Sequence, residues 1–194
     1  MFLFVFISEH SWLIFKELNK SMDSFERAKK IKLAIFDVDG VMTDGSLYLA
    51  DDGQEFKAFN SLDGHGMKML NRSGVDLAII TGRTSKLVEL RARNLGVTHL
   101  YQGIEDKLAA FLELLGKCGL NPEECAYMGD DVVDLPVMRR CGLAVCVPAA
   151  PALVKQHAHH VTQLAGGHGA VREICEMIMQ AQETFDEQLA PYLK

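Results

Sequence analysis

The chain has 194 residues, of which 48% are hydrophobic, and its formal net charge at pH 7 is −6. This length fits one domain with a sizeable buried core. The acidic balance argues against a general nucleic-acid-binding protein, which needs a basic surface to neutralise phosphates. A few local Lys and Arg residues still allow a small anionic substrate to bind in one cleft.

Residues 1–21 differ in composition from the rest of the chain. The first fifteen are rich in Phe, Leu, Val and Ile, but they lack the basic start and the cleavage site of a signal peptide and are too short to span a bilayer. We therefore expect a non-homologous or disordered extension, followed by one folded domain over residues 22–194. The five cysteines include no Cys-x-x-Cys pair, which favours free thiols in a cytoplasmic protein without membrane attachment.

From residue 31 onward, short apolar runs alternate with helical patterns. Strands are predicted over residues 33–36, 77–80, 99–101, 126–128 and 143–147. Helices are predicted over residues 86–94, 107–117, 135–140 and 152–157, with one long helix from 170 to about 189. Three glycines follow helical stretches at positions typical of left-handed caps, namely Gly96, Gly119 and Gly142. The alternation predicts a three-layer, Rossmann-like α/β fold with a parallel sheet.

Residues 47–59 interrupt this alternation. Two short apolar runs flank an Asp-Asp-Gly sequence at residues 51–53, which is typical of a β-hairpin. The two aspartates could be metal ligands, but a solvated turn explains them better. Only this hairpin and one short helix fit between Asp39 and Thr81. The expected fold therefore has a β-hairpin flap beside the cleft and no cap domain.

Polar side chains follow several predicted strands at their carboxyl ends. Asp37 and Asp39 follow the first strand, Thr81 follows the second, Asp130 follows the fourth, and Lys107 begins a helix. Because the carboxyl ends of parallel strands meet along one edge of a sheet, we expect these residues to converge on one crevice. Two carboxylates two residues apart can divide the work of nucleophile and acid, which suggests phosphoryl transfer.

This chemistry assigns a role to each residue of the crevice. Asp37 is expected to attack phosphorus, while Asp39 protonates the leaving group and later deprotonates the attacking water. The Thr81 hydroxyl and the Lys107 ammonium are expected to bind the equatorial phosphate oxygens, where charge is held in the transition state. Asp134 is placed to hold Lys107 by an ion pair.

A Mg²⁺ ion suits this set of carboxylates, because it prefers oxygen ligands and neutralises the charge of a phosphate monoester. Asp37 and Asp130 are the expected direct ligands. The backbone carbonyl of Asp39 is expected to be a third. Asp131 is expected to be either a further ligand or the holder of a metal-bound water.

The order of these motifs resembles that of the haloacid dehalogenase superfamily, over residues 22 to 192. Segments that look like its capless family of 3-deoxy-D-manno-octulosonate 8-phosphate phosphatases are 39–45, 59–64, 81–83, 129–131 and 166–169. This resemblance implies a Mg²⁺-dependent homotetramer of lipopolysaccharide biosynthesis that acts on a small sugar phosphate. It also implies that the hairpins form an intersubunit barrel.

The same resemblance implies which residues contact the substrate: Asp39, Asn60, Ser61, Leu62, Asp63, Gly64, Lys68, Arg83, Arg91 and Lys107. Some members of the family carry Arg or Lys where Leu62 stands, and Arg where Lys68 stands. Lys lacks the bidentate fork with which Arg holds a carboxylate. The glycine-rich segment 166–169 is, on its residues alone, either a linker into the last helix or an anion-approaching loop. By resemblance, it is expected to cover the site of a neighbouring subunit.

Two alternatives remain beside this interpretation. The same chemistry could act on another acidic sugar phosphate, such as a sialic-acid-type 9-phosphate. A non-catalytic module, either a receiver-like phosphoacceptor or a tetramerising scaffold, could also carry Asp, Thr and Lys at strand ends. A receiver has its acceptor on a middle strand, whereas here the pair follows the first. An inactive scaffold is expected to have lost Asp37 or Asp39.

Overall fold

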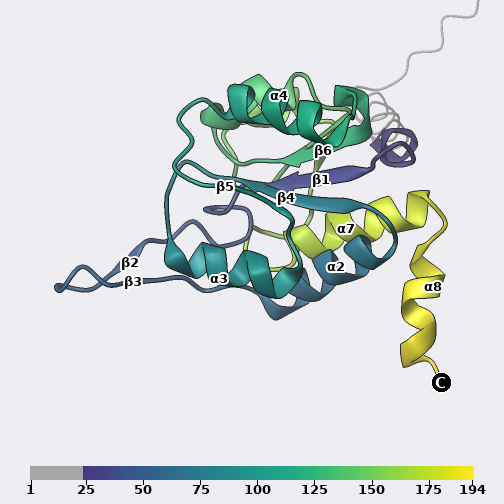
Figure 1. The fold of residues 1–194 in the computed structure, drawn as a ribbon, viewed down its shortest axis with the longest axis horizontal. Coiled ribbons are helices and arrows are strands. Elements are labelled where there is room, and N and C mark those ends of the chain that lie inside the picture. Colours follow the sequence, from purple (N-terminus) through teal and green to yellow (C-terminus); the bar gives the residue numbers. More distant parts are fainter. Residues whose placement is uncertain (1–23) are drawn as a thin grey trace, which may run out of the picture.

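A computed structural model describes residues 24–194 of the chain, so the extension expected over residues 1–21 and the first two residues of the expected domain lie outside the described residues. Six parallel strands form one sheet in the order β5-β4-β1-β6-β7-β8, and β2 and β3 form a separate hairpin. Helices cover both faces of the sheet (Figure 1). The prediction of a three-layer α/β fold is confirmed.

All five predicted strands of the sheet are present. They are β1 (Leu33–Phe36), β4 (Asp76–Ile80), β5 (His99–Tyr101), β6 (Cys125–Met128) and β7 (Leu143–Cys146). Every residue of β1, β6 and β7 is buried, as expected for parallel strands covered on both faces. A sixth strand, β8 (His160–Val161), pairs with β7 and was not predicted, because two residues are too few to show a pattern.

The helices form the two outer layers of the fold. Figure 1 shows α4 (Lys107–Cys118) over one face, and α2 (Ser61–Arg72), α3 (Lys86–Leu95) and α7 (Ala170–Ala181) over the other. The remaining elements are α5 (Leu135–Met138), α6 (Ala152–His157), α8 (Phe185–Leu189), and the short 3₁₀ turns η1 (Pro122–Glu124), η2 (Val132–Asp134) and η3 (Ala190–Tyr192). Within the described chain, no helix is both long and apolar enough to cross a membrane.

Helix α2 is the one helix expected between Asp39 and Thr81. The side chain of Asn60 caps it by accepting hydrogen bonds from the backbone N–H groups of Leu62 and Asp63. Two glycines within α2 permit close packing. A Cβ at Gly66 would lie 2.7 Å from a side-chain carbon of Arg172 on α7, so these two helices approach closely at this point.

The prediction of one long C-terminal helix is wrong. Helix α7 ends at Ala181, and α8 begins at Phe185 in a new direction (Figure 1). Glu183 has a left-handed φ of 59°, and the side chain of Gln182 donates to the backbone carbonyls of Ala28 and Ile31. The break thus coincides with contacts to distant carbonyls, which the apolar spacing of the segment cannot reveal.

Two of the three predicted left-handed glycine caps are confirmed. Gly96 and Gly119 have φ angles of 78° and 65° at the ends of α3 and α4. The prediction for Gly142 is wrong, since its φ is not positive. A Cβ there would lie 2.1 Å from the carbonyl oxygen of Glu123, so close backbone packing explains this glycine.

The predicted hairpin is confirmed but is shorter than the apolar runs suggested. It consists of β2 (Tyr48–Leu49) and β3 (Glu55–Phe56) and extends away from the body of the molecule (Figure 1). Asp52 accepts a hydrogen bond from the backbone of Gln54 at 3.0 Å, which is the solvated turn expected at this tip. No cap domain follows β1 in the described chain.

Candidate active site

A cleft of about 530 Å³ lies at the carboxyl ends of the central strands. The next strand of the sheet after β1 is β4, on one side of β1, and the next strand after β6 is β7, on the opposite side of β6. The loops that follow β1 and β6 therefore diverge, and a crevice opens between them. Residues predicted from the sequence that line it are Asp37, Asp39, Thr81, Arg83, Lys107, Asp130 and Asp131. The predicted convergence of these side chains is confirmed.

The sheet fixes the backbone of the site residues. The N–H of Asp37 donates to the carbonyl of Met128 at 3.0 Å, and the N–H of Thr81 donates to Tyr101 at 3.0 Å. These bonds continue the strand pairing one residue beyond β1 and β4. The sheet therefore holds rigid the backbone of Asp37, the candidate nucleophile, and of Thr81, the predicted phosphate-binding residue.

Lys107 lies between two carboxylates. Its Nζ is 2.6 Å from Asp37 Oδ2 and 2.7 Å from Asp134 Oδ1, so the predicted ion pair with Asp134 is confirmed. Burial, followed by repulsion from Asp134, raises the pKa of Asp37 to about 6, against the lowering effect of Lys107. Burial lowers the pKa of Lys107, but the two carboxylates raise it by more. This cation is therefore held charged beside the candidate nucleophile.

Asp134 is the buried anchor of the site. Its Oδ1 also accepts a hydrogen bond from the Tyr127 hydroxyl at 2.7 Å, and its Oδ2 accepts from the backbone N–H groups of Asp130 and Asp131 at 3.0 and 3.1 Å. With Lys107, four donors satisfy one carboxylate. Sequence reasoning missed Tyr127, because a tyrosine inside an apolar strand is indistinguishable there from a core residue.

The carboxylate of Asp130 completes an acidic group suited to a metal ion. One oxygen from each of Asp37, Asp130 and Asp134 lies within 4.8 Å of the others. Burial, followed by repulsion from Asp37 and Asp134, raises the pKa of Asp130 to about 7. No described residue donates a hydrogen bond to this carboxylate, whereas donors already surround Asp134. Asp37 and Asp130 therefore fit a divalent cation such as Mg²⁺, which prefers carboxylate oxygens.

Asp131 also lines the cleft, at its exposed rim. Its Oδ1 accepts a hydrogen bond from the backbone of Val132 at 2.7 Å, which begins η2. Asp131 thus caps the turn that carries Asp134. Its predicted part in metal binding stays a prediction.

Asp39 lies at the mouth of the cleft and has two cationic neighbours. Its Oδ1 is ion-paired with Lys57 from the hairpin, and its Oδ2 is 3.8 Å from Nε of Arg83. Arg83 lines the cleft, in agreement with its predicted contact with the substrate. Lys57 was not predicted, because 18 residues separate it from Asp39 and only the fold of the hairpin brings the two together.

Most of the other residues that the resemblance linked to the substrate lie on α2 or α3 and do not line the cleft of their own chain. Some have structural partners. Asp63 accepts hydrogen bonds from the backbone N–H groups of Gly169 and Arg172 at the start of α7, and Arg91 donates to the carbonyl of Asn60. The residues outside the cleft are Asn60, Ser61, Leu62, Asp63, Gly64, Lys68 and Arg91. Their contact with substrate stays a prediction.

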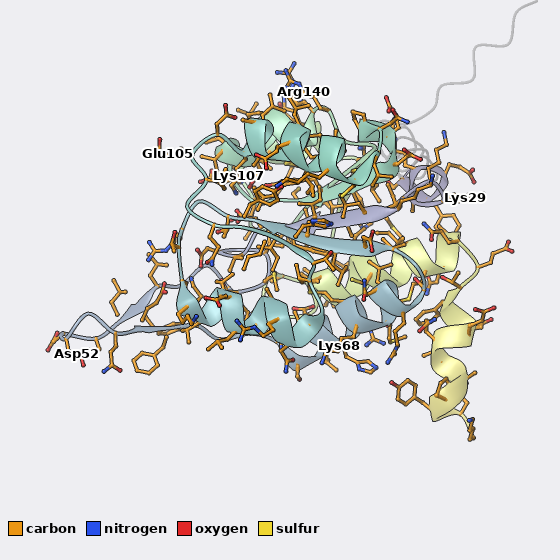
Figure 2. All side chains as sticks on the ribbon, in the orientation of Figure 1. Lys29, Asp52, Lys68, Glu105, Lys107 and Arg140 are labelled. Atoms are coloured by element: carbon orange, nitrogen blue, oxygen red, sulfur yellow. The ribbon has the colours of Figure 1, made fainter. Side chains whose placement is uncertain are left out.

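Two of these positions differ clearly in environment. Lys68 extends from α2 toward Asn94 of α3, with 3.4 Å between Nζ and Oδ1. Figure 2 shows its side chain on the opposite side of the sheet from Lys107. The Gly64 position, in contrast, is sterically restricted, since a Cβ there would lie 2.2 Å from the Arg91 guanidinium. This glycine therefore admits Arg91 against the start of α2.

The expectation that segment 166–169 covers the site of a neighbouring subunit stays a prediction, and within its own chain the segment has a defined position. The N–H of Gly167 donates to the carbonyl of Val41 at 3.0 Å, and a Cβ at Gly166 would lie 1.8 Å from the carbonyl oxygen of Gly40. The segment is thus packed on the loop after β1 of its own chain and leads directly into α7. Its glycines are needed for this close backbone contact.

Comparisons with known proteins agree with this geometry. The haloacid dehalogenase-like hydrolase family matches residues 50–142. A 3-deoxy-D-manno-octulosonate 8-phosphate phosphatase of Yersinia pestis is 52% identical over 164 residues, which cover 84% of this chain and 88% of that protein. The corresponding phosphatase of Escherichia coli K12 is 50% identical over 86% of this chain and 89% of its own.

A solved structure is similar over nearly the same extent. The 3-deoxy-D-manno-octulosonate 8-phosphate phosphatase of Moraxella catarrhalis, in complex with magnesium, phosphate and KDO, superposes with a TM-score of 0.86. It shares 43% sequence identity, and the match covers 88% of this chain and 98% of that chain. These relatives and the cleft described above show that the chain belongs to the haloacid dehalogenase-like hydrolases, in the family of the 3-deoxy-D-manno-octulosonate 8-phosphate phosphatases.

Proposed function

We propose that the chain is a Mg²⁺-dependent phosphatase that hydrolyses 3-deoxy-D-manno-octulosonate 8-phosphate to KDO and inorganic phosphate, in lipopolysaccharide biosynthesis. The observation that carries this proposal is the meeting of Asp37, Asp39, Lys107 and Asp130 in one cleft. Relatives with half of their residues identical carry that activity in their names.

In the first half of the reaction, an oxygen of Asp37 attacks phosphorus. A bond forms between Asp37 and phosphorus, the bond between phosphorus and the sugar oxygen breaks, and that oxygen takes a proton from Asp39. Lys107 already lies beside Asp37 and is placed to bind a phosphoryl oxygen together with the Thr81 hydroxyl. The sugar leaves as an alcohol, and Asp37 carries the phosphoryl group.

In the second half, Asp39 takes a proton from water and the water oxygen attacks phosphorus. The bond between Asp37 and phosphorus breaks, which releases inorganic phosphate and restores the free carboxylate. Asp37 and Asp130, with the Asp39 backbone carbonyl and Asp131, would hold Mg²⁺. When bound, Mg²⁺ neutralises negative charge that the phosphate ester would otherwise bring against these carboxylates.

We further propose that the enzyme is a cytoplasmic homotetramer whose hairpins meet. Apolar side chains of the hairpin are largely exposed in the single chain, with Leu49 65% and Phe56 57% exposed. Exposed apolar groups gathered on one flap are typical of a protein interface. The substrate residues that the resemblance places on α2 begin nearby, with Leu62 62% exposed. The cysteines of the described chain are free thiols, as expected in a reducing compartment.

The decisive experiment measures phosphate release by the purified full-length chain with Mg²⁺. The panel contains 3-deoxy-D-manno-octulosonate 8-phosphate, a nine-carbon sialic-acid-type 9-phosphate and a sugar phosphate without a carboxylate. We expect the first to give the highest kcat/KM, with Asp37→Asn as the inactive control. Preference for the nine-carbon ester would overturn the substrate. Stable phosphorylation without release from any ester would support a receiver-like module instead.

A further inference from the structure

Lys57 has a buried side chain at the end of a hairpin that is largely exposed. Its side chain is only 2% exposed, although the preceding residue, Phe56, extends into solvent. Burial of an ammonium group is costly unless carboxylates compensate it. Two do so here, because Nζ is ion-paired with Asp39 Oδ1 and lies 3.3 Å from Glu55 Oε1. The hairpin therefore places an ammonium group, compensated by two carboxylates, beside Asp39, the candidate acid–base group.

Lys57 is part of a four-residue ionic network. Glu55 Oε1 also lies 3.3 Å from Nη2 of Arg83, whose Nε is 3.8 Å from Asp39 Oδ2. Each oxygen of Asp39 thus has a different cation beside it. Arg83 lines the cleft, whereas Lys57 does not. Lys57 therefore acts on the reaction through its neighbours, directly through Asp39 or, by way of Glu55, through Arg83, and the ion pair with Asp39 is the more direct route.

We propose that Lys57 is a positioning residue that holds one oxygen of Asp39 and leaves the other directed to the cleft, where it exchanges protons with the leaving group and with water. This inference rests on the proposed function, because it assigns a partner to the acid–base group of that mechanism. Without Lys57, the Asp39 side chain could rotate about its side-chain torsions. A misplaced acid–base group loses much of its catalytic effect.

Through Lys57, the position of the hairpin affects the position of the acid–base group Asp39. Lys57 directly follows β3, so a displacement of the hairpin also displaces the group that orients Asp39.

The test uses steady-state kinetics of the full chain with Mg²⁺ and the sugar phosphate. Lys57→Met removes the charge and keeps most of the apolar stem, and it should lower kcat by roughly 10- to 100-fold with little change in KM. Lys57→Arg should recover part of the loss. Lys86→Met is the matched control, because among the described residues Lys86 pairs with Glu89 alone, on the surface of α3, and its loss should not alter kcat. A change confined to KM, or unchanged kcat, would refute the proposal.

A double-mutant cycle separates positioning from a general structural effect. If Lys57 acts through Asp39, adding Lys57→Met to Asp39→Asn should cause no further loss of kcat. Equal losses in both backgrounds would mean that Lys57 acts elsewhere. Thermal melting and sedimentation of each variant identify loss of fold or assembly. If Lys57→Met does not fold, Glu55→Gln removes the second anchor of Lys57 and should give a smaller loss with the same dependence on Asp39.

An aryl phosphate gives a readout that does not depend on the identity of the sugar. Nitrophenolate leaves with little protonation, so formation of the phosphoenzyme should be less sensitive to Asp39 than its hydrolysis. Lys57→Met should therefore show a larger burst of nitrophenol than the unsubstituted protein, followed by slower turnover; no increase in the burst would count against the proposal. If the unsubstituted protein hydrolyses no phosphate ester, the proposed function itself fails, whereas normal hydrolysis without an effect of Lys57 removes only this inference.

Discussion

The carboxyl edge of the sheet and the hairpin differ in how completely their side chains find partners within one chain. At the edge, Asp134 is fully buried and has four hydrogen-bond donors, and sheet bonds fix the backbone of Asp37. The hairpin has two residues in each strand and exposes large apolar side chains at Leu49 and Phe56. Within one chain, the polar groups around Asp134 are therefore satisfied, whereas the hairpin leaves large apolar side chains exposed.

This difference separates the chemistry from the selection of substrate. The groups expected to attack, protonate and bind phosphate already lie together in the single chain. The residues that the resemblance linked to the sugar lie mostly outside that cleft, on α2 and α3. We therefore expect changes at the edge, and at Lys57 beside it, to affect every phosphate ester, and changes at the exposed apolar side chains of the hairpin to affect mainly the sugar phosphate.

The largest expected effect is at the edge. Asp37→Asn keeps the shape of the side chain but removes the nucleophile, so turnover of both sugar and aryl phosphates should fall by about 10⁴-fold or more. Phosphate release from both esters, with circular dichroism to verify the fold, measures this change. Substantial residual turnover in a clean preparation would contradict the covalent mechanism.

Metal removal should also abolish activity, and its effect on stability should depend on pH. The pKa values of Asp37 and Asp130 are about 6 and about 7 in the metal-free fold, whereas the pKa of an aspartate in the unfolded chain is about 4. Between these values the folded state binds more protons than the unfolded state, so the contribution of these groups to stability falls as pH rises. Mg²⁺ should therefore raise the melting temperature more at about pH 7.5 than at about pH 5.5. Equal shifts at both pH values would argue against these ligands.

The hairpin should give a smaller and more selective effect. Replacing Leu49 and Phe56 by Ser should prevent tetramer formation and lower kcat/KM for the sugar phosphate by roughly ten-fold, with little change for an aryl phosphate. Sedimentation and the two kinetic assays test both parts. Asp52→Asn is the control, since Figure 2 shows Asp52 at the far tip of the hairpin. A similar loss for both substrates would remove the distinction between the two regions.

The smallest expected effect is that of Tyr127→Phe. This change removes one of the four donors to Asp134, which should cost about 2 kcal/mol of the free energy of unfolding and lower kcat a few-fold by loosening Lys107. Urea unfolding and kinetics measure the two effects. Tyr101→Phe is the matched control, because the partners of the Tyr101 hydroxyl in the described part of the chain are the exposed side chains of Glu113 and Lys117. A larger kinetic effect at Tyr101 would contradict the assigned role of Tyr127.

The sequence predicts the sheet and the edge well because both depend on local patterns. Apolar runs mark the buried strands, and the geometry of a parallel sheet then brings Asp37, Thr81 and Asp130 to one side. No contact between distant segments needs to be known for this inference. The same rule placed Lys107, since it begins the helix that follows β5.

Other parts of the site depend on tertiary contacts that leave no local pattern. Asp63 bonds to the backbone of Gly169 and Arg172, which lie 106 and 109 residues later. Lys57 reaches Asp39 only because the hairpin folds back, and segment 166–169 reaches Gly40 through close backbone packing. Resemblance supplied an expectation for segment 166–169, namely that it covers a neighbouring site, and this stays a prediction.

The packing of segment 166–169 on the loop after β1 has a consequence for synthesis on the ribosome. Asp37 emerges early and Asp130 before β7, but the backbone partner of Val41, Gly167, is among the last parts of the fold to be made. A nascent chain that ends after β8 carries every catalytic side chain, yet it lacks both this contact and α7. Competence for catalysis should therefore appear late in translation, and arrested chains of increasing length should gain phosphatase activity only once α7 has left the exit tunnel.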